Sequence, residues 1–163
     1  MLARLSFSVF LFLVTISCSP GEKSYEYVTD RVGILKAEDK EKLSSEMAAL
    51  EKQIGSQLAI LIIDSTDGES LEEFSLKTAN EWKLGRKDID DGVLIVVSTV
   101  DRQVRIEVGE GLEKVISDPE AGKIIGQYIT PAFRQEKYFE GLFLAVMSIK
   151  QRIQQNQKLV EEK

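Results

Sequence analysis

Apolar residues follow a helical period in one part of the chain and form an unbroken run in the next. A stripe of apolar residues at spacings of three and four predicts a helix over residues 37–54, which Gly55 ends. This stripe consists of Leu43, Met47, Leu50 and Ile54. Residues 57–64 (QLAILIID) are almost continuously apolar, which indicates a strand covered on both faces.

The same pattern continues through the rest of the chain. Residues 70–73 (SLEE) form a capping box and open a second helix that runs to Trp82. A short turn joins a buried strand, 93–97, to an alternating strand, 102–108. Later segments are a helix that starts at Asp118-Pro119 with Asp118 as its N-cap, an interruption at Thr130-Pro131, and a final helix over 138–155.

These elements predict an α/β fold, a small three-layer α/β/α sandwich with a central mixed sheet of about four strands flanked by helices. A strand–helix–strand unit makes strands 57–64 and 93–97 parallel, and a hairpin makes strand 102–108 antiparallel to the latter. Residues 28–155 form the predicted domain, and residues 28–35 are a short entry segment to it.

Acidic residues are concentrated in a loop that leads into the second strand. Residues 88–91 (DIDD) precede this strand, and residues 109–111 (GEG) follow the next strand. A hairpin returns the second loop to the first, so we expect both at one edge of the sheet. Crowded carboxylates repel one another unless a cation or a basic side chain neutralises them.

Composition narrows the chemistry that is available. The chain has 163 residues, a net charge of −6, no histidine and one cysteine. The acidic balance argues against nucleic acid as a partner, and the lack of histidine excludes a Ser-His-Asp triad and His-ligated zinc. Oxygen ligands remain available for a hard cation such as Ca²⁺ or Mg²⁺.

The N-terminal segment predicts export and lipid attachment. Residues 1–17 hold one basic residue and then a mostly apolar run that is typical of a signal peptide. Ser17-Cys18 resembles a bacterial lipoprotein cleavage site, so we expect acylated Cys18 to anchor the chain on the periplasmic side of the outer membrane or on the cell surface. The alternative is plain secretion with an unmodified cysteine. Residues 18–27 are then a polar tether, and residues 156–163 a polar tail.

Several stretches together resemble the TPM domain family. Its members include a thylakoid-lumen protein of photosystem II repair, a nematode acetylcholine-receptor auxiliary subunit and many bacterial membrane-anchored proteins. The resemblance covers roughly residues 28–150, and the block 102–113 is its most specific part. The matching stretches are Asp30…Gly33-x-Leu35, Trp82-Lys83-Leu84-Gly85, Asp91-Gly92-Val93-Leu94, Asp101–Glu113, Asp118-x-x-Ala121-Gly122 and Pro131-x-Phe133-Arg134…Tyr138.

The resemblance implies a small α/β/α sandwich and divalent-cation binding, with calcium favoured over magnesium. Carried residue by residue, it points to Asp30, Asp90 and Asp91, with Asp88 and Asp118 as possible additions. We therefore expect a metal site at an edge formed by Asp30, residues 88–91 and the loop after Val108. The alternative is a solvated acidic loop in which Asp91-Gly92 is ordinary turn chemistry.

Two functions from different classes follow from the resemblance. The preferred one is a cation-binding accessory factor that helps to maintain a membrane protein complex. The other is a metal-dependent acid phosphatase, since some family members are credited with weak activity of this kind. Arg102 and Arg105 are candidates to hold a phosphate, although pairing with Glu107, Glu110 or neighbouring acids is the preferred explanation for them.

Overall fold

Four strands form one mixed sheet in the computed structural model, which describes residues 25–161. The strands are β1 (Val28–Asp30), β2 (Gln57–Ile63), β3 (Gly92–Ser98) and β4 (Gln103–Val108). They lie in the order β1-β2-β3-β4; the first three are parallel, and β4 pairs antiparallel with β3. The predicted parallel pair, the hairpin and the mixed sheet are thus confirmed.

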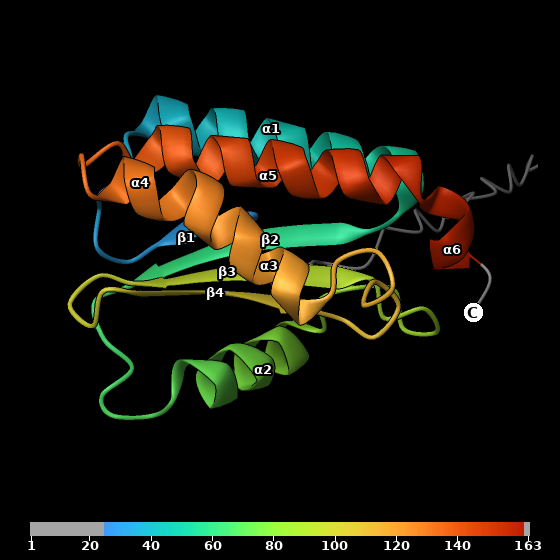
Figure 1. Cartoon of the computed structure of the whole chain (residues 1–163), viewed down its shortest axis with the longest axis horizontal. Coiled ribbons are helices and arrows are strands. Elements are labelled where there is room, and N and C mark those ends of the chain that lie inside the picture. The colour runs from blue at the N-terminus through green and yellow to red at the C-terminus, as the bar shows by residue number, and fades with distance from the viewer. Residues whose placement is uncertain (1–24, 162–163) are drawn as a thin grey trace, which may run out of the picture.

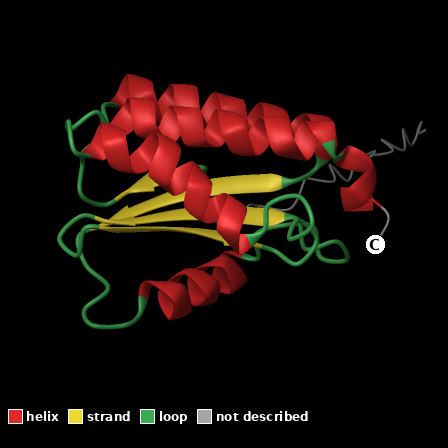
Figure 2. Cartoon of the chain, viewed as in Figure 1, coloured by secondary structure: helices red, strands yellow, loops and turns green. Residues whose placement is uncertain are grey.

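Helices cover both faces of this sheet and complete the predicted sandwich (Figures 1 and 2). α1 (Ala37–Ile54) and α5 (Tyr138–Gln155) lie on one face, and α2 (Leu71–Trp82) lies on the other. A continuous helical segment next to β4 consists of α3 (Asp118–Ile124), the π-helical turn η1 (Ile125–Ile129) and α4 (Thr130–Phe133). α6 (Gln157–Glu161) follows α5.

The two central strands are apolar on both sides because helices cover both sides. Alternate residues of β2 point to opposite faces: Ile60 belongs to the core under α1 and α5, whereas Leu61 belongs to the core under α2. Both side chains are at most 1% exposed. This double burial explains why the strand reads as a continuous apolar run rather than an alternating one.

The two strand–helix–strand crossovers have opposite hands. Each step, from β1 to β2 and from β2 to β3, moves in the same direction across the sheet. The helix of the first step, α1, and the helix of the second, α2, nevertheless lie on opposite faces. Since right-handed crossovers are the strong norm, one of the two is of the rare left-handed kind.

The predicted interruption at Thr130-Pro131 is a widened turn rather than a break. The Thr130 N–H donates to the carbonyl of Ile125, five residues earlier, which closes a π-helical turn. Pro131 has no N–H, and its ring would clash with the carbonyl four residues earlier in a regular α-helix. The wider turn accommodates the proline and carries the helix on to Phe133.

Both ends of the described chain are packed more closely than predicted. Tyr25, assigned to the tether, stacks on Trp82 with ring centroids 5.9 Å apart. Val160, assigned to the polar tail, is buried in the main core. Residues 1–17 and Cys18 lie outside the described residues. Between residues 25 and 161, no helix combines the length and apolar character needed to cross a membrane.

Candidate functional site

The edge at which β2 and β3 begin, called here the amino edge, is held by a buried ion pair. The Asp91 side chain is fully buried, and its Oδ2 lies 2.6 Å from Arg86 Nη2. The Ser56 hydroxyl donates to the same oxygen at 2.8 Å, and the Arg86 backbone N–H donates to Oδ1 at 2.8 Å. Burial alone would raise the pKa of the Asp91 carboxyl, but these hydrogen bonds lower it below its ordinary value.

The acidic loop and the glycine loop meet at this edge, as predicted. The backbone N–H of Glu110 donates to Asp90 Oδ2 at 3.0 Å, and that of Gly111 donates to the Asp90 carbonyl at 2.9 Å. Asp90 itself adopts a left-handed conformation with φ of 58°. The two loops therefore join mainly through backbone hydrogen bonds, and the Asp90 carboxylate closes the junction.

Asp30 lies at the other end of the sheet, which contradicts the predicted gathering of five carboxylates. It pairs with Ile62 near the end of β2, whereas Asp91 lies next to the start of β3. The Asp30 carboxylate accepts backbone N–H groups from Val32, Gly33 and Leu35, at 3.1, 2.7 and 2.9 Å. A three-residue strand parallel to β2 places this aspartate at the opposite edge.

The remaining predicted ligands are exposed. Asp88 is in the loop before β3, and Asp118 is the first residue of α3, with Ser117 rather than Asp118 as the N-cap. Within residues 25–161, no group of three acidic or cysteine side chains comes together in a way that could hold a metal ion. The structure therefore does not bring the five predicted ligands together, because the Asp91 carboxylate is paired with Arg86 and Asp30 lies at the far edge.

The two arginines proposed for phosphate binding are in different surroundings. Arg105 Nε donates to Glu107 Oε2 at 2.7 Å, and Arg105 Nη2 lies 3.5 Å from Glu72. Burial alone would lower the pKa of Arg105, but its acidic neighbours, Glu107 first, raise it. The pairing alternative therefore explains Arg105, which lies against α2 and not in a cavity.

Arg102 instead lines a cavity at the carboxyl edge, where the parallel strands end. The cavity has a volume of about 620 Å³ and lies between the β3–β4 turn and the α4–α5 turn. Its lining residues are Val97, Ser98, Thr99, Arg102, Gln103, Val104, Thr130, Phe133, Arg134, Glu136 and Tyr138. Open α/β sheets usually bind ligands at this edge.

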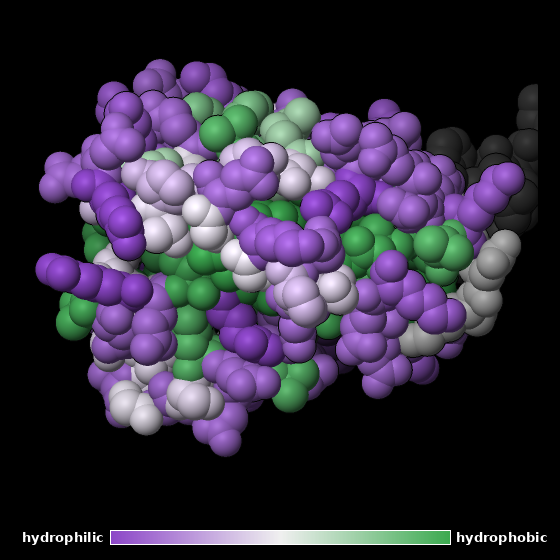
Figure 3. All heavy atoms as spheres, viewed as in Figure 1, coloured by the Kyte–Doolittle hydropathy of each residue, from purple (hydrophilic) through white to green (hydrophobic). Residues whose placement is uncertain are grey.

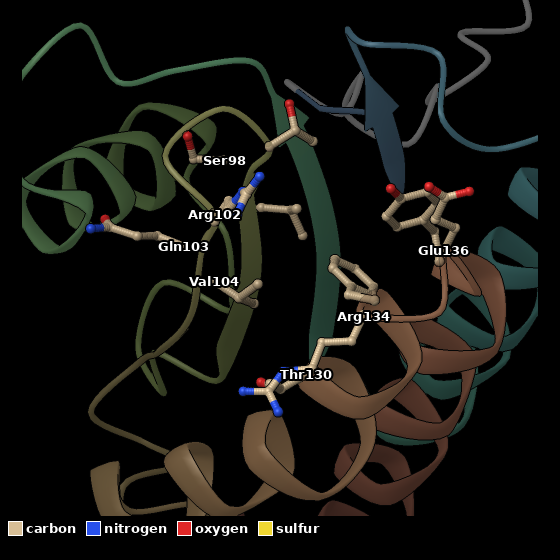
Figure 4. Close-up of a pocket in the computed structure, with 11 residues that line it drawn as sticks. Ser98, Arg102, Gln103, Val104, Thr130, Arg134 and Glu136 are labelled. Carbon is tan, nitrogen blue, oxygen red and sulfur yellow. The ribbon is translucent and has the colours of Figure 1, made fainter.

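Figure 4 shows how the charged side chains are arranged around the cavity. Arg102 extends from the β3–β4 turn, and Arg134 extends from the helical side, with its guanidinium close to Thr130 in this view. Within the described residues, neither guanidinium has an ion pair or a hydrogen bond to a protein group. Their donors are directed to solvent and are available to an anion.

The turn that carries Arg102 is fixed by Asp101. The Ser98 hydroxyl donates to Asp101 Oδ2 at 2.6 Å, and the Thr66 N–H donates to the same oxygen at 3.1 Å. These hydrogen bonds, that of Ser98 first, lower the pKa of the Asp101 carboxyl. Arg102 adopts a left-handed φ of 54° at this turn, a conformation that costs energy for a residue other than glycine.

Sequence analysis missed most of this cavity. Arg134, Thr130, Phe133 and Tyr138 come from a helical segment far along the chain from the β3–β4 turn. No motif spacing links the two segments, although Phe133, Arg134 and Tyr138 belong to a stretch that carries the family resemblance. That stretch was the one available signal.

Comparison with known proteins decides the family. The TPM domain model matches residues 28–152, most of the chain. The chain belongs to the TPM domain family. The TPM domain resembles the N-terminal domain of a protein from P. gingivalis, with 30% identity and a TM-score of 0.75 over 83% of this chain and 86% of that one. No match was found among curated proteins.

Two more distant structures share the fold. The N-terminal domain of the cg2496 protein from Corynebacterium glutamicum is 15% identical, with a TM-score of 0.63 over 83% of this chain and 84% of that one. The BA42 protein from Bizionia argentinensis is 18% identical, with a TM-score of 0.65 over 74% of this chain and 82% of that one. Identity at this level supports the TPM fold alone.

Proposed function

We propose that this TPM domain is a binding module whose cavity at the carboxyl edge takes up an anionic group. In this proposal the domain is lipid-anchored through Cys18 outside the cytoplasm and acts as an accessory factor of a membrane protein complex. The observation that carries the proposal is the cavity of about 620 Å³ with Arg102 and Arg134 at its rim. Guanidinium groups bind carboxylates and phosphates through paired hydrogen bonds.

Two of the hydroxyl groups at the cavity, those of Ser98 and Thr99, are poorly placed for nucleophilic catalysis. Ser98 is 1% exposed and its hydroxyl lies 2.6 Å from Asp101 and 3.1 Å from the Asp64 carbonyl, so it is held in the turn. The Thr99 hydroxyl donates to the Ile63 carbonyl at 3.2 Å. A nucleophile needs an accessible oxygen next to a base, and neither side chain offers both.

The second candidate, an acid phosphatase, is favoured by the same arginine pair. A guanidinium group at this rim that holds an anion would equally hold the phosphoryl group of an ester. The two candidates predict the same binding site and differ only in turnover. One set of variants therefore tests both.

The first experiment measures the binding of inorganic phosphate by calorimetry. Replacing Arg102 or Arg134 by Gln is expected to weaken binding about tenfold or more, because a hydrogen bond to a charged group contributes about 1.5–3 kcal/mol. Arg152→Gln is the matched control: it removes the same charge, but Arg152 pairs with Glu120 and does not line the cavity. Equal affinity in all four proteins would refute the site.

A turnover assay then separates the two candidate functions. The binding module is expected to leave p-nitrophenyl phosphate intact under conditions in which inorganic phosphate binds. Hydrolysis by the unmodified protein that is lost in both Arg102→Gln and Arg134→Gln would establish the phosphatase instead. Hydrolysis that survives in both variants would point to a contaminating enzyme.

A further inference from the structure

The floor of the cavity at the carboxyl edge is apolar, although its rim is charged. Val97 is 2% exposed and belongs to the main core, and Val104 is half-buried beside it. Phe133 and Tyr138 complete the floor from the helical side, with ring centroids 5.1 Å apart. Figure 3 shows apolar surface in a hollow between the helices and the strands, edged by hydrophilic side chains.

A bare ion would use only part of such a cavity. Phosphate bound at a guanidinium group of the rim would leave the valine and phenylalanine surface in contact with water. An apolar group attached to the anion would cover that surface, and each buried methylene would strengthen binding about fourfold. An apolar floor below a cationic rim therefore suits a ligand that has an anionic group attached to an apolar body.

The formal charges of the lining residues are compatible with a singly charged ligand. Arg102 and Arg134 are the basic residues of the lining, and Glu136 is the acidic one. Figure 4 shows the Glu136 carboxylate away from both guanidinium groups, although Glu136 and Arg134 come from the same side of the cavity. The lining thus carries one net positive charge, which a singly charged carboxylate balances and a doubly charged phosphate monoester exceeds.

We infer that the cavity binds an amphiphilic carboxylate, with the carboxylate at the cationic rim that Arg102 and Arg134 provide and the apolar body on the floor of Val97, Val104 and Phe133. The carboxylate belongs either to a small organic acid or to the C-terminal residue of a polypeptide. This inference rests on the proposed function, because it specifies the ligand of the same cavity.

The test is a series of unbranched carboxylates, from acetate through butyrate to hexanoate, measured by calorimetry or by amide chemical shifts. Affinity is expected to rise about fourfold per methylene until the floor is covered. Val104→Thr keeps the shape of the side chain but adds a hydroxyl, so it is expected to lower the affinity for hexanoate and to flatten this dependence on chain length. Val108→Thr, on the same strand outside this cavity, is the control and should change neither.

The outcomes distinguish the inference from the function on which it rests. Equal affinity for acetate and hexanoate, with phosphate bound normally, overturns the amphiphilic ligand and leaves the anion-binding module standing. Failure of every anion to bind overturns both.

A second arm identifies the source of the carboxylate. A tripeptide with a C-terminal leucine is compared with its C-terminal amide and with hexanoate. Tighter binding of the free-acid peptide supports a polypeptide end as the ligand, and tighter binding of hexanoate supports a small acid. Equal binding of the peptide and its amide contradicts recognition of a carboxylate.

Discussion

Asp91 shows how a residue typical of a ligand site can instead have a structural role. Its carboxylate is fully buried and neutralised by Arg86, whose side chain is 34% exposed. The same carboxylate also accepts the Ser56 hydroxyl and the Arg86 backbone N–H. It thereby connects the loop before β3 to the segment before β2, two stretches that are far apart in the sequence.

Replacement of Asp91 by Asn is expected to destabilise the fold by about 3 kcal/mol at neutral pH, because it leaves the Arg86 charge half-buried without a partner. Urea unfolding of the variant and of the unmodified protein measures the difference. Asp88→Asn removes the same charge at an exposed position and is expected to have little effect.

The loss of stability caused by Asp91→Asn should depend on pH. The folded-state pKa of Asp91 is lowered, so its contribution to stability is complete above the unfolded pKa of about 3.9 and is lost as the pH falls toward the folded value. The stability difference between Asp91→Asn and the unmodified protein should therefore shrink below about pH 4. A difference that grows on acidification would contradict this assignment.

At the scale of the elements, glycines allow two loops to interlock at the amino edge. A Cβ on Gly111 would lie 2.0 Å from the Ile89 carbonyl oxygen, and one on Gly109 would lie 2.3 Å from the Asp90 carbonyl oxygen. No real Cβ tolerates such a distance from backbone, so these positions require glycine for close approach. This requirement gives the Gly109-Glu110-Gly111 pattern a structural reason.

Gly111→Ala is expected to lower stability by about 2–3 kcal/mol, since the backbone around residue 89 must move to make room. Gly122→Ala is the paired control within α3, where an added Cβ meets nothing within 4 Å. That change should be neutral or stabilise by up to about 1 kcal/mol, because alanine favours helix. Thermal unfolding of the two variants distinguishes them, and equal losses would argue against the interlock.

Long elements could be predicted from the sequence, and short ones could not. The helices over 37–54 and 138–155 follow directly from several turns of apolar period, and the structure confirms their limits. β1 spans only Val28–Asp30, too few residues to show a period, and without it the edge that holds Asp30 was misjudged. The π-helical turn before Pro131 likewise arises from backbone sterics that apolar spacing does not record.

At the scale of the whole molecule, one edge of the sheet is closed and the other is open to solvent. The amino edge is closed by the ion pair of Asp91 and by interlocked loops, whereas the carboxyl edge opens into the cavity with Arg102 and Arg134. Sequence analysis placed the functional edge at the acidic loop, because charge density is visible in a sequence. A cavity assembled from two distant segments is visible only in the fold.

Helix α6 packs onto the main core, although composition suggested a polar tail. Val160 is fully buried and Leu159 beside it is 46% exposed. Val160→Ala is expected to cost about 2 kcal/mol of stability, because it removes buried apolar surface, whereas Leu159→Ala should cost little. Guanidinium unfolding of both variants checks this, and identical midpoints would mean that α6 does not contribute to the core.

The stacking of Tyr25 on Trp82 fixes how the domain would be presented on a lipid surface. Trp82 ends α2 at the amino edge, so Tyr25 lies at the end of the domain opposite the cavity. Tyr25 is seven residues after Cys18, and a fully extended chain over seven steps spans at most about 25 Å. In the proposed lipid-anchored form, the amino edge would stay within that distance of the acyl group, and the arginines of the cavity would lie at the opposite edge of the sheet.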